Sequence, residues 1–259
     1  MQGVWLGSLD AVMVPAQPCI SSEFLSDPLV FAAFQNERAF TVTLILDYDA
    51  GNLGSVKRAC SEVGLQAEFS AHPDALAQAE RIIFPGVGAA GSAMRSLRER
   101  GLDTALKNAI AKGTPLLGIC LGMQVSLDYS EENDTPTLGL LGGRVQRFKL
   151  NQPELKIPHM GWNEVKVQQS HPVLAGIEPG DEFYFVHGYY PMPTAPEHVL
   201  TLTEYEGDFV SALGKNNYIG TQFHPEKSGR VGLRLFENFA RWDGVWQGAA
   251  SPAGGANAQ

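Results

Sequence analysis

Strand-like and helix-like segments alternate four times between residues 41 and 127, and this alternation constrains the fold more than any other feature of the chain. The segment 41–46 is apolar and rich in β-branched residues, which is typical of a strand buried on both faces. Further strands are predicted at 67–69, 81–84 and 115–119, and helices at 53–63, 73–79, 93–111 (with an interruption at Gly101) and 121–127. Because crossovers between parallel strands are right-handed, this pattern predicts a parallel sheet with helices on both faces.

The second half of the chain has a different pattern, with short strand-like segments joined by short turns. Such segments are predicted at 144–148, 164–167, 182–187, 199–203 and 210–213, followed by a strand at 218–223 and an amphipathic helix at 232–241. Hairpins of this kind add antiparallel strands to an α/β core. The predicted fold class is therefore α/β, with a mostly parallel, doubly wound sheet and added antiparallel hairpins in one domain that covers residues 40–246.

The two ends of the chain lack this periodicity. Residues 1–39 contain one basic residue and four acidic ones, which fits neither a secretory signal nor a transit peptide. We expect this segment to be a poorly ordered leader. Residues 247–259 carry no charge and are small or polar, so they are expected to form a disordered tail.

Composition excludes several classes of function. The 28 acidic residues outnumber the 19 basic ones and give a net charge of −9, which argues against nucleic-acid binding. No run of 18 apolar residues is present, so no membrane span is expected. The three cysteines are far apart in the sequence, which argues against a disulfide framework or a zinc site and favours a reducing compartment, the cytoplasm. No histidine–carboxylate cluster has the spacing of metal ligands, so neither a metal nor an organic cofactor is expected.

The segment Gly118–Gly122 lies where a buried strand is predicted to pass into a helix. It has the form of a nucleophile elbow, Gly-x-Ser-x-Gly, with Cys120 at the position of the serine. The glycines permit the tight turn, the helix N-terminus favours a thiolate, and the backbone N–H of Leu121 points to where an oxyanion forms. The alternative is that Cys120 is a small buried apolar residue.

A nucleophilic thiolate needs a base, and the base needs an acceptor that orients it. His224 follows a predicted strand, and Glu226 lies two residues further on, where an extended chain places it on the same side. His72 and Asp74 have the same spacing, but Asp74 is explained there by the start of a helix. The other four histidines have no such carboxylate; His171 and His187 precede Pro and Gly, and His159 and His198 are predicted to lie in loops.

The glycine-rich turn Pro85–Gly88 also follows a buried strand. Because the ends of parallel strands share one edge of a sheet, this turn is expected near Cys120, where a backbone N–H completes an oxyanion hole. A phosphate-binding loop is disfavoured, since a Walker lysine and the Gly-x-Gly-x-x-Gly spacing are both missing. An ordinary tight turn is the remaining alternative.

Together, residues 118–124 and 223–226 resemble the triad signature of class I glutamine amidotransferases. More narrowly, the chain is similar to the glutaminase subunits of imidazole glycerol phosphate synthases over residues 41–242. The segments that carry this resemblance are 47–56, 85–88, 157–163 (Ile-Pro-His-Met-Gly-Trp-Asn), 184–187 and 224–229. Residues 40–246 would then be a glutamine amidotransferase domain.

The resemblance implies a role for individual residues. Cys120 would attack the glutamine amide, His224 would transfer the proton, and Glu226 would orient the imidazole. The oxyanion hole would use the N–H groups of Leu121 and Val87. The remaining residues that it assigns are Gly88, Gln124, Tyr189 and Ser228 in the glutamine pocket, and Asn52, Met160, Trp162, Tyr184 and Lys227 at the interface with the partner.

The implied partner is a (β/α)8-barrel cyclase, which receives the ammonia in a heterodimer and makes imidazole glycerol phosphate and AICAR for histidine biosynthesis. Two alternatives stay open. One is a class I glutaminase subunit that serves anthranilate or pyridoxal phosphate synthesis, and the other is a non-catalytic interaction module on the same scaffold. Asp49, Ala50 and Gly188 depart from the family pattern at the interface and the pocket rim.

Overall fold

The computed structural model describes residues 43–49 and 52–248. The predicted leader, residues 1–39, and all but the first two residues of the predicted tail, 247–259, lie outside the described residues. In the part of the chain that is described, no helix has both the length and the apolar character needed to cross a membrane.

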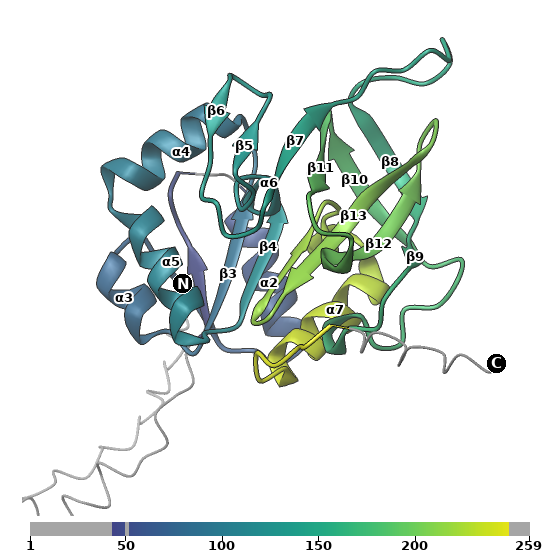
Figure 1. Ribbon diagram of the computed structural model, residues 1–259. Helices are drawn as coiled ribbons and strands as arrows, with labels where there is room; N and C mark the ends of the chain where they lie inside the picture. Colours follow the sequence, from purple (N-terminus) through teal and green to yellow (C-terminus); the bar gives the residue numbers. More distant parts are fainter. Residues whose placement is uncertain (1–42, 50–51, 249–259) are drawn as a thin grey trace, which may run out of the picture. The chain divides into compact units, whose positions relative to one another are not determined.

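An eight-stranded sheet forms the centre of the fold, in the order β2-β1-β3-β4-β14-β13-β12-β9 (Figure 1). The first five strands are parallel to one another, and the last three are antiparallel additions. The sheet therefore confirms the predicted fold class. Its strands are β1 (Thr43–Leu46), β2 (Ala67–Ser70), β3 (Arg81–Gly86), β4 (Leu116–Cys120), β9 (Lys166–Val167), β12 (Val199–Glu204), β13 (Asp208–Lys215) and β14 (Tyr218–Thr221).

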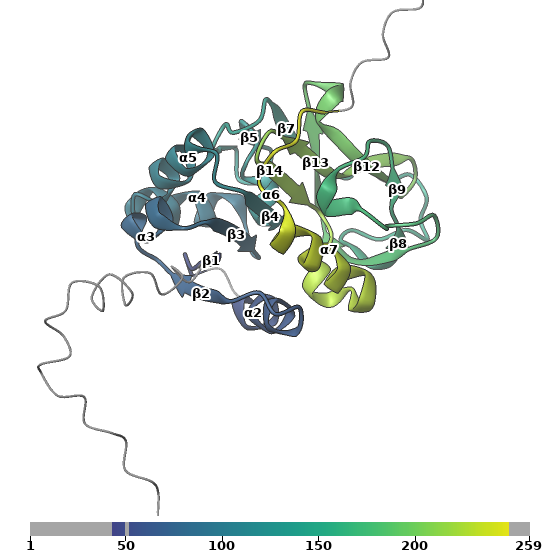
Figure 2. The ribbon, with the colours of Figure 1, turned by 90° about the horizontal axis from the view of Figure 1, so that it is seen from below.

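Helices cover both faces of this sheet, because successive residues of each buried strand point to opposite sides. In β1, Ile45 packs with α2 (Leu53–Glu62) and α7 (Gly229–Arg241). Its neighbours Leu44 and Leu46 belong to the apolar core on the other face. That core is closed by α3 (Pro73–Gln78), α4 (Ala90–Glu99) and α5 (Leu102–Lys112) (Figures 1 and 2). The break between α4 and α5 falls at Gly101, as predicted.

Two smaller sheets are present in addition to the central sheet. One pairs β8 (His159–Glu164) with β10 (Glu182–His187), and the other has the order β11-β7-β5-β6. The strands of the second are β5 (Tyr129–Ser130), β6 (Thr135–Pro136), β7 (Gly143–Arg147) and β11 (Tyr189–Pro193). The remaining short elements are α6 (Leu121–Gln124) and the 3-10 helices η2 (Pro172–Leu174), η3 (Pro196–His198) and η4 (Pro225–Lys227).

The structure corrects two predictions of secondary structure. The predicted helix 121–127 is the single turn α6, and His159, which was expected in a loop, begins strand β8. In β8 the usual alternation is reversed, because Met160 and Trp162 are exposed whereas His159 is buried. A pattern search for apolar residues on the buried face therefore misses this strand.

Replacing Gly122 by alanine tests the close packing between α6 and β3. A Cβ at Gly122 would overlap the carbonyl oxygen of Phe84, so one backbone segment must move. We expect the free energy of unfolding to fall by about 3 kcal/mol or more, as measured by urea denaturation. Gly54→Ala in α2 is the matched control, because a Cβ there meets nothing within 4 Å; it should raise stability by up to about 1 kcal/mol. Wild-type stability of Gly122→Ala would contradict the packing argument.

Candidate active site

Cys120 stands at the junction between β4 and α6, as the elbow pattern predicts. Its backbone has φ 52° and ψ −109°, an unusual conformation for a residue with a side chain. The flanking glycines allow this turn to pack, since a Cβ at Gly118 would lie 2.6 Å from the hydroxyl of Tyr218 and one at Gly122 would overlap β3. The thiol lines a cavity of about 360 Å³.

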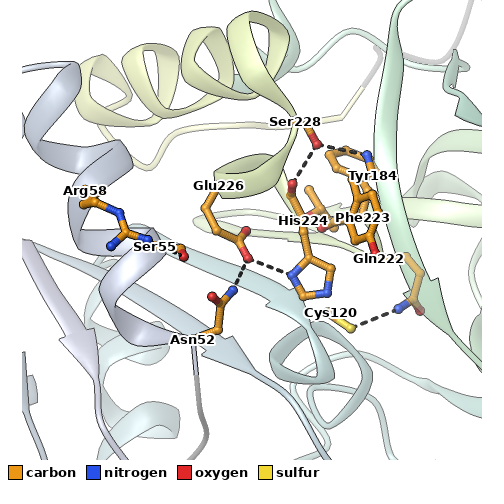
Figure 3. A network of polar contacts seen from close by, with 11 residues as sticks. Asn52, Ser55, Arg58, Cys120, Tyr184, Gln222, Phe223, His224, Glu226 and Ser228 are labelled. Atoms are coloured by element: carbon orange, nitrogen blue, oxygen red, sulfur yellow. Dashed lines mark hydrogen bonds and ion pairs between the residues drawn. The ribbon is translucent and has the colours of Figure 1, made fainter. Parts of the chain in front are cut away.

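His224 and Glu226 form a buried hydrogen-bonded pair next to Cys120 (Figure 3). The Nδ1 atom of His224 lies 2.8 Å from Oε1 of Glu226, and their side chains are 2% and 1% exposed. This contact was predicted from an extended chain over residues 224–226, but the chain does not continue as a strand after His224. Glu226 belongs to the 3-10 turn η4, which brings the carboxylate back to the imidazole.

Two further contacts hold this pair in place. The side-chain amide of Asn52 donates a hydrogen bond of 2.6 Å to the same Oε1 of Glu226. The hydroxyl of Ser228 donates to the carbonyl oxygen of His224 at 2.6 Å and accepts from the backbone N–H of Tyr184 at 3.0 Å. The ring of His224 is therefore anchored through both its side chain and its backbone (Figure 3).

The charge state of His224 depends on its neighbours. A carboxylate only accepts, so Nδ1 carries a proton; Nε2 is turned toward Cys120 and has no hydrogen-bond partner among the described residues. Burial lowers the pKa of His224, but the Cys120 sulfur and the hydrogen bond to Glu226 outweigh burial and raise this pKa to about 10. The imidazole of His224 is therefore protonated at neutral pH, next to the sulfur of Cys120.

The other histidines are not placed to act on Cys120. His72 is exposed before α3, whose first turn contains Asp74, in agreement with the helix-start interpretation. Burial lowers the pKa of His171 to about 3, and its ring packs against two tryptophans away from the cavity. His187 lines the cavity but bonds His159 and a backbone carbonyl instead.

The glycine-rich turn meets the elbow as predicted, because Gly86 is the register partner of Cys120 across β3 and β4. Beyond Gly86, Val87 and Gly88 line the cavity together with Leu121. Two backbone segments that are candidates for an oxyanion hole therefore face the same space as the thiol.

The cavity wall contains most of the residues predicted for a substrate pocket. Gln124, Tyr189 and Gly188 line it. A Cβ at Gly188 would lie 3.4 Å from a methyl group of Ile157, an ordinary contact distance, so the small side chain of the family pattern would also fit at this position. Ser228, also predicted for the pocket, is not among the residues that line the cavity, and its hydroxyl is bonded to the carbonyl oxygen of His224.

Sequence reasoning missed two polar residues of the site. Glu132 lines the cavity, and its carboxylate accepts a hydrogen bond of 2.8 Å from the N–H of Ala90. Gln222 is fully buried, and its amide nitrogen lies 3.6 Å from the sulfur of Cys120. Glu132 lies in an acidic loop, and nothing in the sequence of that loop indicated that it would reach the cavity. Gln222 had a signal, because it directly precedes the motif of residues 223–226.

The residues predicted to face a partner cluster beside the triad. On the outer face of the β8–β10 pair, Trp162 lies opposite Tyr184, and the ammonium group of Lys227 lies 5.7 Å from the centre of the Tyr184 ring. Met160 and Trp162 are 62% and 54% exposed. We call Met160, Trp162, Tyr184 and Lys227 the β8–β10 patch. Asn52 differs from these four, because its amide is bonded to Glu226.

Comparison with known proteins agrees with this geometry. The family model described as "Glutamine amidotransferase class-I" matches residues 44–242. The chain is 46% identical over 203 residues to the "Imidazole glycerol phosphate synthase subunit HisH" of Nitratidesulfovibrio vulgaris strain Hildenborough, covering 76% of this chain and 95% of that protein. The subunit with the same description from Dehalococcoides mccartyi is 47% identical over 197 residues, covering 75% and 94%.

Solved structures show the same fold at lower sequence identity. A structure described as PurLQS from Thermotoga maritima has a TM-score of 0.62 at 19% identity, covering 76% of this chain and 96% of that chain. A crystal structure described as a glutamine amidotransferase has a TM-score of 0.57 at 20% identity, covering 77% and 98%.

The reactivity of Cys120 tests its pairing with His224. Because the pKa of His224 is raised to about 10, the imidazolium persists at pH 7 to 9 and is lost as the pH rises through 10. We expect iodoacetamide to alkylate Cys120 faster than an ordinary thiol at pH 7, because a neighbouring cationic imidazole stabilises a thiolate. In His224→Asn, which has no cationic imidazole beside the sulfur, the rate at pH 7 should be at least tenfold lower.

Mass spectrometry of the peptide that contains Cys120 measures this rate. Cys60 is the internal control, since burial raises its pKa to about 12 and it should stay unmodified. Equal alkylation rates at pH 7 in the wild type and in His224→Asn would contradict the pairing of Cys120 with His224.

Proposed function

The chain belongs to the class I glutamine amidotransferase family, and on that basis we propose that it hydrolyses L-glutamine to glutamate and ammonia. The ammonia passes to a (β/α)8-barrel cyclase, and the two chains form a heterodimeric imidazole glycerol phosphate synthase of histidine biosynthesis in the cytoplasm. The observation that carries this proposal is the complete Cys120–His224–Glu226 set at a substrate-sized cavity. The HisH descriptions of relatives that are 46% and 47% identical support the pathway.

The reaction proceeds in two steps at Cys120. The thiolate attacks the side-chain amide carbon of glutamine, and the N–H groups of Leu121 and Val87 stabilise the oxyanion. His224 then donates the proton on Nε2 to the departing nitrogen, which leaves as ammonia, and a glutamyl thioester remains. In the second step, His224 takes a proton from the attacking water, and glutamate is released.

Glu226 and Asn52 support this proton transfer without touching the substrate. The hydrogen bond from Nδ1 of His224 to Glu226 keeps the other nitrogen directed at Cys120, which is the function of the third member of such triads. The amide of Asn52 orients the carboxylate in turn. Asn52 is therefore a positioning residue in addition to its place near the interface.

Glu132 gives the pocket its preference for an amino acid. Its carboxylate lines the cavity and suits the α-ammonium group of glutamine, since charge-assisted hydrogen bonds are the stronger ones. Gly88, Gln124 and Tyr189 complete the wall around the substrate. Ser228 acts from behind by holding the backbone of His224.

The β8–β10 patch suits the docking of the cyclase. Met160 and Trp162 present large apolar side chains to solvent, and such exposed groups are typical of the centre of a protein interface. Lys227 adds a cation next to the aromatic ring of Tyr184. Because Lys227 follows Glu226 directly, a partner on this patch lies close to where ammonia is released.

The two alternatives from the sequence are less well supported. A glutaminase of anthranilate or pyridoxal phosphate synthesis would share the triad, but relatives at 46% and 47% identity are described as HisH subunits. A non-catalytic module has no need for a buried Cys–His–Glu set with a strained nucleophile.

Cys120→Ala separates the two activities of the assembled enzyme. We expect glutamine-dependent synthesis of imidazole glycerol phosphate to be abolished, because the thioester is no longer formed. Synthesis from added ammonium salts should persist, since the cyclase requires only free ammonia. Loss of both activities in an intact heterodimer would contradict this division, and pull-down of the cyclase by the variant is the control for assembly.

Glu132→Gln tests the recognition of the α-ammonium group. We expect the KM for glutamine to rise about tenfold to a hundredfold with a smaller change in kcat, because one charge-assisted hydrogen bond is weakened. Glu131→Gln is the matched control; its carboxylate accepts from the N–H of Arg147 outside the cavity. Equal KM values for the two variants would contradict a contact between Glu132 and the α-ammonium group of glutamine.

A further inference from the structure

We propose that Gln222 is a further catalytic residue, whose side-chain amide donates a hydrogen bond to the sulfur of Cys120 and whose orientation is set by Gln124. This inference rests on the proposed function, because it adds a donor to the same nucleophile. It starts from a fully buried amide whose nitrogen lies 3.6 Å from that sulfur. Figure 3 shows the sulfur between the imidazole of His224 and the amide of Gln222.

The direction of the hydrogen bond follows from a backbone carbonyl. The carbonyl oxygen of Tyr189 only accepts, so the nitrogen of the Gln124 side chain must face it, at 3.0 Å. The same nitrogen lies 3.0 Å from Oε1 of Gln222, and its second hydrogen is donated there. The oxygen of Gln222 is therefore turned toward Gln124, and its nitrogen is left to face Cys120.

A second set of contacts fixes the Tyr189 carbonyl. It also lies 2.7 Å from Nδ1 of His187, which must donate. Nε2 of His187 then accepts from Nδ1 of His159, at 3.1 Å. Nε2 of His159 in turn accepts from the amide of Asn163, at 3.3 Å. Each N–H hydrogen in this chain has its own acceptor, and the second hydrogen of the Asn163 amide is donated to the carbonyl oxygen of Glu204 at 2.9 Å, so one pattern of hydrogen bonds satisfies all of these contacts.

The two histidines keep this pattern at neutral pH. Burial lowers the pKa of His159 to about 4 and that of His187 to about 3. Both rings are therefore neutral, each with one donor and one acceptor nitrogen. A protonated His187 would lack the acceptor that His159 requires.

The amide of Gln222 acts on the sulfur at two points of the reaction. Before attack, its N–H stabilises the thiolate, because a hydrogen bond to a charged acceptor is stronger than one to a neutral thiol. When water opens the thioester, the electron pair of the carbon–sulfur bond returns to sulfur, and the same N–H stabilises the departing thiolate. His224 supplies the proton transfers, and Gln222 exchanges no proton.

Gln222→Glu is the first test, because it keeps the acceptor for Gln124 and removes the donor to sulfur. At pH 7.5, without glutamine or a partner, we expect alkylation of Cys120 by iodoacetamide to slow about tenfold or more. Gln222→Met, which removes donor and acceptor at similar volume, should slow it by a similar factor. A thermal unfolding scan of each full-length variant identifies any loss of fold.

Gln124→Glu tests the orientation argument. Its carboxylate cannot donate to Gln222, so the amide of Gln222 turns its nitrogen away from the sulfur. We expect the same slowing of alkylation as in Gln222→Glu. For glutamine hydrolysis by the heterodimer, Gln222→Met should lower kcat about tenfold with little change in KM, because Gln222 does not line the cavity. A residue that only supports the fold would not give slowed alkylation and a lower kcat together with an unchanged KM.

The outcomes separate the two claims. Alkylation rates within twofold of the wild type in all three folded variants would overturn the role of Gln222, whatever the activity with glutamine. If alkylation is slowed in the variants but the wild-type chain releases no glutamate with its partner, the role of Gln222 at the sulfur stands and the proposed function is rejected.

Discussion

The close approach of the Gly122 backbone to the carbonyl oxygen of Phe84 is the contact on which the site depends. It brings the first turn of α6 against β3, so that the N–H groups after Cys120 and the turn after Gly86 face one cavity. The pairing of Gly86 with Cys120 aligns the two strand ends. Because the elbow is made of backbone, a side chain at Gly122 would push apart α6 and β3, the two segments that lead to the candidate oxyanion donors.

A buried carboxylate then joins the two ends of the described domain. Glu226 lies in the turn before α7, and its Oε1 accepts from His224 and from Asn52 at the start of α2. A charge that is 1% exposed is costly unless it is paired and hydrogen-bonded. The geometry of the imidazole therefore depends on the packing of α2 beside α7, which are remote in sequence but belong to the same apolar core.

Much of the site could be predicted where local chemistry is distinctive. The Gly-x-Cys-x-Gly elbow and the His-x-Glu pair are short patterns, and the residues of each lie next to one another in the sequence. The prediction failed for β8, because its exposed face carries Met160 and Trp162 while His159 is buried. Glu132 was missed for another reason: its carboxylate reaches the cavity through a loop between short strands, and no periodicity describes such a path.

By itself, the sequence determined the α/β class and indicated a candidate nucleophile and a candidate base, since buried strands, tight glycine turns and adjacent side chains follow from local sterics and spacing. Only the tertiary structure decided how the polar groups around the sulfur are paired. The side chains of Gln222 and Gln124 are 98 positions apart, and His159 is 28 residues from His187. Such partners are chosen by which strands lie side by side in the folded sheet, because hydrogen bonds require contact within about 3 Å.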